Sequence, residues 1–202
     1  MFYEPSAGHG LPHDPFKAIV APRPIGWIST VAADGSLNLA PYSFFNALGT
    51  NPHLVMFSSE GAKDSATYAS ETGEFVVNLV TRDLVDRMNA SSIDAPRGVS
   101  EFGHAGLTPV PSRLVKPPRV GEAHAALECK VTEIVRPKGL DGRTGDRFAV
   151  FGEVVGVHID EAMLDENGLF DIVRAGTVAR LGYMDYAAVT ETFSMRRPRW
   201  EE

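Results

Sequence analysis

Residues 24–42, PIGWISTVAADGSLNLAPY, contain the clearest structural signal in this sequence. Residues 24–33 are rich in β-branched and aromatic side chains, and they run into the dipeptide Asp34-Gly35. This dipeptide favours the two-residue turn of a β-hairpin, because such a turn needs positive φ angles that Gly adopts without strain. The stretch therefore predicts a hairpin whose return strand is SLNLAPY, residues 36–42.

Other strands and helices are expected on both sides of the central part of the chain. Strand candidates are residues 54–59 (LVMFSS), 74–80 (EFVVNLV), 125–135 (AALECKVTEIV) and 147–159 (RFAVFGEVVGVHI). Short helices are expected after Asp64 or Ser65 as far as Gly73, over 82–90, and near 160–166, whereas the proline-rich residues 94–121 are expected to form a long loop or lid. About six strands with short helical insertions predict a mostly β, largely antiparallel barrel.

Composition narrows the class of protein. The chain of 202 residues has a net charge of -7, from 19 basic and 26 acidic side chains, which argues against a nucleic-acid footprint. Cys129 is the single cysteine, so an internal disulfide framework is excluded and a reducing cytoplasm is expected. No run of 18 apolar residues is present. We therefore expect one cytoplasmic domain over 1–202, with an N-terminal arm (1–11), a C-terminal tail (192–202) and no membrane partner.

The sequence lacks the motifs of several common classes of enzyme. The sequence has no G-x-G-x-x-G, no P-loop, no G-x-S-x-G and no H-E-x-x-H. His9 and His13 stand four residues apart, but Gly10 and Pro12 between them make a helical metal face implausible, and no metal site is predicted. Cys129 falls on the apolar side of its predicted strand, which favours a buried, inert thiol over a nucleophile.

The following stretch, PYSFFNALGTNPHLVMFSS (residues 41–59), carries polar groups within an otherwise apolar run. A buried hydroxyl or amide without a partner costs about 1–3 kcal/mol, so these groups imply either a tight turn or a ligand. Phe44 with Ser43 and Asn46 offers an apolar wall beside donors and acceptors, as a flat heteroaromatic ligand with imide-like edges requires. A turn in which Asn46 bonds its own backbone remains the alternative.

A second polar group lies at the start of the predicted helix after residue 63. Ser58 and Ser59 end a strand, and Lys63, Ser65 and Thr67 follow within a few residues. A helix N-terminus with a lysine can bind a phosphate, because its first N–H groups lack intrahelical partners. In the alternative, Ser65 and Thr67 satisfy only the local backbone and Lys63 is a solvated charge.

These residues and their order resemble a known family. APRPIGWISTVAADGSLNLAPYSFFNALGTNPHLVMFSS, KDSATYASETGEFVVNLV, FGEVVGVHI and ARLGYMDY resemble the flavin reductase-like, FMN-binding split-barrel proteins, which include flavoredoxins and short-chain flavin reductases, and the likeness spans roughly 12–198. The resemblance implies a split β-barrel, a homodimer and FMN bound near the subunit interface. The positions it assigns to the flavin are Thr30, Ser43, Phe44, Asn46, Ser58, Ser59, Lys63, Asp64 and Thr67, with Arg180 as a weaker candidate.

The resemblance also implies an activity. Hydride transfer from NAD(P)H to the bound flavin, with electrons passed to an oxygenase or another acceptor, is the leading hypothesis. An electron carrier or redox sensor without its own NAD(P)H reaction is the second, and a barrel that binds pyridoxal phosphate or haem is the third. No general acid or base is predicted, because hydride transfer depends on stacking geometry.

Three roles stay open at this point. His158 could approach the nicotinamide or could be a core or interface residue. Arg180 could bind the flavin or form a salt bridge at the barrel end. The basic tail SMRRPRW could be solvated, or it could pack Trp200 across a dimer or offer Arg196 and Arg197 to an NADPH phosphate.

Overall fold

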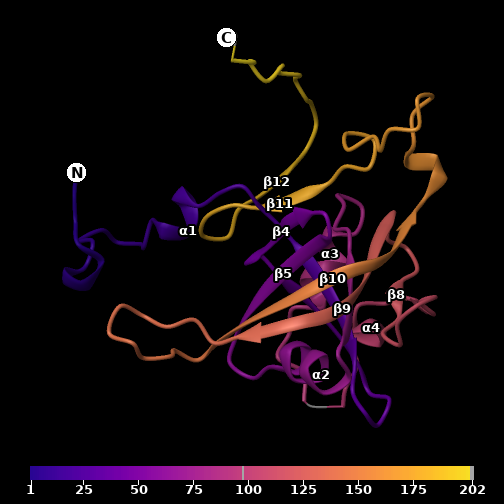
Figure 1. Ribbon diagram of the computed structural model, residues 1–202, viewed down its shortest axis with the longest axis horizontal. Coiled ribbons are helices and arrows are strands. Elements are labelled where there is room, and N and C mark those ends of the chain that lie inside the picture. The colour runs from indigo at the N-terminus through magenta and orange to yellow at the C-terminus, as the bar shows by residue number, and fades with distance from the viewer. Residues whose placement is uncertain (97, 201–202) are drawn as a thin grey trace.

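A curled antiparallel sheet of seven strands forms the centre of the fold, shown in Figure 1 as a computed structural model that describes residues 1–96 and 98–200. The strand order is β3-β2-β6-β9-β10-β5-β4. Their bounds are Gly26–Val31 (β2), Leu37–Tyr42 (β3), Phe45–Thr50 (β4), His53–Glu60 (β5), Glu74–Asn78 (β6), Ala125–Val135 (β9) and Arg147–Ile159 (β10). The sheet curls into a half-barrel, which confirms the predicted mostly β, antiparallel class.

Smaller elements surround this sheet. β1 (Arg23–Pro24), β11 (Val178–Arg180) and β12 (Tyr186–Ala188) form a three-stranded sheet, and β7 (Pro109–Val110) pairs with β8 (Arg119–Val120). The helices are α1 (Phe16–Ile19), α2 (Asp64–Thr72), α3 (Val85–Ala90) and α4 (Glu101–His104), with single 3-10 turns at Pro5–Ala7 and Glu161–Met163. No helix within the described ranges has the length and apolar character needed to cross a membrane.

The hairpin and the two long strands were predicted correctly, but the two-residue turn was not: Ala32 pairs with Ser36, so the loop holds the three residues 33–35. β2 and β3 pair across the turn at Gly35, whose φ is 89°, and the Asp34 carboxylate accepts a hydrogen bond from the Ser36 N–H at 2.9 Å. β9 and β10 begin and end at the predicted residues, because their length and apolar content leave few alternative boundaries.

Other boundaries differ from the prediction. β4 was not expected, because its residues are largely exposed at the sheet edge and lack a burial pattern. Helix α2 begins at Asp64 with Lys63 in the N-cap position, and its cap has no side-chain hydrogen bond, so neither Asp64 nor Ser65 is the N-cap. The expected helix over 82–90 begins only at Val85, and the one near 160–166 is a single 3-10 turn.

The core consists of two main clusters on opposite faces of the hairpin. Trp27 belongs to a cluster that packs under α3 and α4, whereas Ile28, the next residue, belongs to a cluster under α2, as strand alternation requires. Cys129 lies in the second cluster with no exposed surface. The thiol is thus buried as predicted; burial raises its pKa, and the neighbouring Glu128 carboxylate adds to this effect, which disfavours a reactive thiolate.

Part of the predicted long loop or lid over residues 94–121 is fastened to the sheet. Within it, residues 112–120 bond through their backbone to polar side chains on β2, β6 and β9. These side chains are Ser29, Glu74, Asn78 and Glu128. Buried backbone groups need hydrogen-bond partners. These side chains supply the partners that a neighbouring strand would otherwise have supplied.

Candidate functional site

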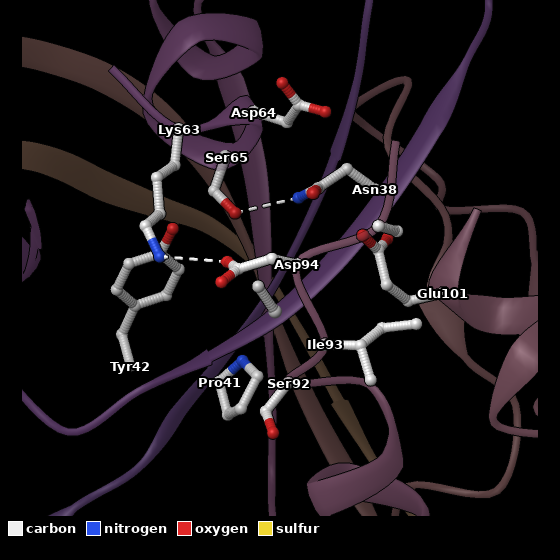
Figure 2. Close-up of a pocket in the computed structure, with 12 residues that line it drawn as sticks. Asn38, Pro41, Tyr42, Lys63, Asp64, Ser65, Ser92, Ile93, Asp94 and Glu101 are labelled. Carbon is white, nitrogen blue, oxygen red and sulfur yellow. Dashed lines mark hydrogen bonds and ion pairs between the residues drawn. The ribbon is translucent and has the colours of Figure 1, made fainter. Parts of the chain in front are cut away.

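Two adjoining cavities lie on either side of Lys63. The larger, about 370 Å³, lies between β3, the start of α2 and residues 92–95 (Figure 2). The smaller, about 190 Å³, lies between β3, the start of β4, the end of β5 and α1. Pro41, Tyr42 and Lys63 line both cavities. A single elongated ligand could therefore pass along the Lys63 side chain from one cavity to the other.

A hydrogen-bonded polar group forms one wall of the larger cavity. The Asn38 amide donates to the Ser65 hydroxyl at 2.8 Å and to the Thr30 hydroxyl at 3.2 Å. Figure 2 shows the bond between Asn38 and Ser65, and on the other side the Lys63 ammonium, 3.3 Å from Asp94. Lys63 and Asp94 are largely exposed, so their ion pair contributes at most about 1 kcal/mol and can open for a ligand.

Glu101 is a buried carboxyl that lines the larger cavity. Only 7% of the residue is exposed, and its carboxylate accepts a hydrogen bond from the Leu39 N–H at 2.9 Å. Burial raises the pKa of the carboxyl, and the Leu39 N–H opposes this shift only in part. The site therefore contains an acid that holds its proton to a higher pH than an exposed glutamate does.

This shift predicts how stability depends on pH. Between the ordinary value of 4.5 and the raised folded value, the folded chain keeps a proton that the unfolded chain loses, so stability falls as pH rises through this window. Glu101→Gln removes that loss and keeps an oxygen acceptor for the Leu39 N–H. We expect the thermal midpoint of the variant, relative to the parent, to be higher at pH 7.5 than at pH 4. An equal difference at both pH values would contradict the assignment.

Tyr42 and Phe44 supply apolar surface beside these polar groups. The Tyr42 ring packs against Phe57 at a centroid distance of 5.0 Å, which holds it against both cavities. Burial raises the pKa of its phenol, although the hydroxyls of Ser65 and Ser59 partly offset the shift. The phenol is therefore a neutral donor at physiological pH.

Two hydroxyls in the smaller cavity make no hydrogen bond to any residue that the structure describes. Ser43 and Ser58 both line it, and within residues 1–96 and 98–200 neither hydroxyl makes a hydrogen bond. The Ser58 backbone N–H bonds instead to the Phe44 carbonyl at 2.8 Å, which fixes both side chains at the cavity. These hydroxyls can therefore donate to a ligand, and polar atoms of this kind are what a phosphate or a ribityl chain needs.

The other predicted flavin residues lie outside the lining of the two cavities, except Asp64, which lines the larger one. Thr30 and Ser59 are fully buried, and Ser59 donates to the Gly61 carbonyl at 3.1 Å. The Thr67 hydroxyl donates to the Ala62 carbonyl at 3.0 Å. Asn46 is exposed on β4 and accepts a hydrogen bond from the Ala47 N–H at 2.8 Å.

Arg180 also contacts residues of its own segment of the chain. Its guanidinium donates to the Tyr183 carbonyl at 2.5 Å and lies 4.4 Å from the centroid of the Tyr186 ring. Among the described residues no carboxylate forms the expected salt bridge with Arg180. His158 lies on β10 with its ring 2.5 Å from the buried Glu128 carboxylate, which places it in the packed sheet.

Sequence reasoning missed several residues that line the cavities, among them Lys17, Asn38, Tyr42 and Glu101. Asn38 had only a partial signal, because a two-residue turn at Asp34-Gly35 would have placed it opposite Val31, whereas the observed register places it opposite Thr30. Glu101 had none, since it reaches the site from a segment without periodicity. Lys17 lies only six residues beyond the expected N-terminal arm.

The curled antiparallel sheet with a ligand-sized cleft beside it is that of the split-barrel proteins. The sequence matches the family described as flavin reductase like domain over residues 20–184, so the chain belongs to this family. The resemblance found in the sequence is thereby confirmed.

Individual relatives agree with this assignment. An uncharacterized protein of Aquifex aeolicus is 37% identical over 169 residues, which cover 81% of this chain and 83% of the relative. The fold is similar to nitrilotriacetate monooxygenase component B from Bacillus cereus, with a TM-score of 0.87, 29% identity and coverage of 96% and 98% of the two chains. It is also similar to 2-nitrobenzoate 2-nitroreductase from Pseudomonas fluorescens, with a TM-score of 0.81, 29% identity and coverage of 93% and 90%.

Proposed function

We propose that this chain is an FMN-dependent oxidoreductase that takes a hydride from NAD(P)H and passes electrons to a second acceptor. The observation that carries the proposal is the position of Lys63 between two cavities, next to the unpartnered hydroxyls of Ser43 and Ser58. A cation, free hydroxyls and aromatic walls form the donor set that a phosphorylated heteroaromatic requires. Membership of the flavin reductase-like family supports flavin as that heteroaromatic.

Each group of residues has a proposed task in holding FMN. Phe44 and Ser43 would face the ring, and Ser58 and Lys63 would hold the ribityl chain and the phosphate. FMN bound there would supply the redox chemistry, accepting a hydride and releasing electrons. The protein would orient the reactants and exclude water, and the backbone N–H groups near Ser43 would stabilise negative charge on the ring.

We further propose that the active form is a homodimer. β4 is an edge strand of the sheet, and Asn46 and Leu48 on it are exposed in the single chain. An uncovered edge strand can pair with or pack against a second copy. This arrangement would bury Asn46, so that its predicted contact with the ring would form only in the assembly.

The first experiment asks whether the purified chain takes up FMN and then reacts. We expect flavin absorption and fluorescence to change on titration with FMN, and flavin absorption to bleach on rapid mixing with NADH or NADPH. Bleaching supports the oxidoreductase, whereas binding without bleaching by either nucleotide supports an electron carrier that is reduced by a partner protein. Failure to bind FMN at all would contradict both.

The similar proteins suggest which class of molecule the second electron acceptor belongs to. The Bacillus cereus protein is a component of a monooxygenase, and an oxygenase is therefore the acceptor that we favour. Reduced chain mixed with such a partner should reoxidise faster than it does with oxygen alone.

A further inference from the structure

The N-terminal segment before β1 brings a lysine to the smaller cavity. The Asp14 carboxylate accepts a hydrogen bond from the Phe16 N–H at 2.9 Å, where α1 begins, and Lys17 follows one residue later. The Lys17 side chain lines the cavity together with Ser43 and Ser58, and its ammonium lies 5.9 Å from the centroid of the Phe44 ring. Lys17 therefore lies at the same cavity as these two hydroxyls.

Arg23 fixes this segment to the body of the protein. Its guanidinium donates to the carbonyls of Lys17 at 2.5 Å and of Leu181 at 2.7 Å, and also to the carbonyl of Val20. Arg23 is 7% exposed and lies 5.9 Å from the centroid of the same Phe44 ring. Because one buried side chain ties residues 17–20 to the segment after β11, the backbone of Lys17 is held in place before any ligand arrives.

Around the smaller cavity, cationic side chains outnumber the carboxylates that could pair with them. Among the described residues, no carboxylate forms an ion pair with Lys17 or Arg23. In the part of the chain that the structure describes, Glu60 is the only residue with a carboxylate that lines the smaller cavity. This carboxylate lies 2.7 Å from the Arg147 guanidinium. Lys17 and Arg23 thus add positive charge beside the Ser58 hydroxyl, and Lys63, whose exposed pair with Asp94 can open, adds a third cation, which favours an anion.

We propose that Lys17 is a second cationic ligand for the phosphate of the bound flavin, positioned by Arg23 and lining the smaller cavity together with Lys63. This inference rests on the proposed function. The family match begins at residue 20, so Lys17 lies outside the part of the chain that the family description covers. Two cations around one phosphate would make the chain prefer a phosphorylated flavin, FMN, over riboflavin.

The test compares the dissociation constants of FMN and riboflavin, measured by quenching of flavin fluorescence in the dark and without a reductant. For Lys17→Ala we expect FMN to bind about tenfold more weakly and riboflavin to bind within about twofold of the parent. Lys138→Ala, which removes an exposed lysine in the loop between β9 and β10, is the matched control and should change neither constant. The FMN defect should shrink as salt is raised, because screening weakens the parent's cation contact.

A second variant separates direct contact from positioning. Arg23→Lys keeps the charge but loses the fork that joins three carbonyls, so it should reproduce most of the FMN defect. The double variant with Lys17→Ala should then bind FMN no more weakly than the worse single variant.

The two dissociation constants separate a wrong role for Lys17 from a wrong proposed function. Equal weakening of both flavins by Lys17→Ala, or no weakening of either, would overturn the role of Lys17 while leaving flavin binding intact. A parent protein that binds neither flavin would overturn the proposed function itself.

Discussion

Glu128→Ala is expected to lower the free energy of unfolding by about 3–5 kcal/mol, the usual cost of removing one partner from a buried ionic contact. The Glu128 side chain is 1% exposed. Its carboxylate accepts hydrogen bonds from the N–H groups of Arg113 at 2.7 Å and Leu114 at 2.6 Å, and lies 2.5 Å from the His158 ring nitrogen. Alanine would remove the shared acceptor of the Arg113 and Leu114 N–H groups and of the partly buried His158 imidazole.

The same contacts set the pH dependence of this contribution. Burial by itself would raise the pKa of the Glu128 carboxyl, but the two N–H groups and His158 outweigh burial and lower it. The stabilisation is therefore fully present above the ordinary value of 4.5 and is lost as pH falls through the lower folded value. The parent should lose stability in this acid window, and Glu128→Ala should lose less.

Thermal and urea unfolding measure the effect. For a chain of this size, 1 kcal/mol corresponds to about 2–4 °C, so the midpoint should fall by about 10 °C. Glu133→Ala is the control, because Glu133 lies on the same strand with its side chain exposed, and it should change stability by less than about 0.5 kcal/mol. A Glu128 variant as stable as this control would show that residues 112–120 are held by other contacts.

The elements that sequence reasoning found are those whose signal is local. The β2–β3 hairpin follows from one turn dipeptide between two apolar segments, and β9 and β10 follow from 11 and 13 residues of strand-forming sequence. The fastening of residues 112–120 has no local signal. It depends on side chains up to 89 residues away, as the bond from Ser29 to Pro118 shows, and only the folded sheet brings them together.

Sequence reasoning found those residues of the candidate site that lie close together in the sequence, and it missed those that come from elsewhere in the chain. Ser43, Phe44, Ser58, Lys63 and Asp64 line the cavities, and all were selected from one continuous stretch. Lys17 and Glu101 reach the cavities from outside that stretch, because the three-stranded sheet and α4 pack against β3 and β4. The family resemblance added the position of Arg180, and the contact of flavin with Thr30, Asn46, Ser59, Thr67 and Arg180 stays a prediction.

Lys63→Ala is expected to weaken FMN by about tenfold to a hundredfold and riboflavin by little. A charge-assisted hydrogen bond to phosphate contributes about 1.5–3 kcal/mol, and riboflavin has no phosphate to lose. The substitution should leave the fold intact, because the pair that Lys63 forms with Asp94 is exposed on both sides. Binding constants for the two flavins, measured alongside thermal unfolding, separate a lost contact from a lost fold.

Asp94→Asn provides the opposite change at the same contact. In the protein without ligand, Asp94 lies 3.3 Å from the Lys63 ammonium, so FMN phosphate must compete with this carboxylate for the cation. Removing the charge of Asp94 should therefore tighten FMN by about twofold to fivefold while leaving riboflavin unchanged, and it should have no effect once Lys63 is alanine. If Lys63→Ala weakens both flavins equally, or if Asp94→Asn tightens FMN even without Lys63, the phosphate does not lie at the Lys63 ammonium.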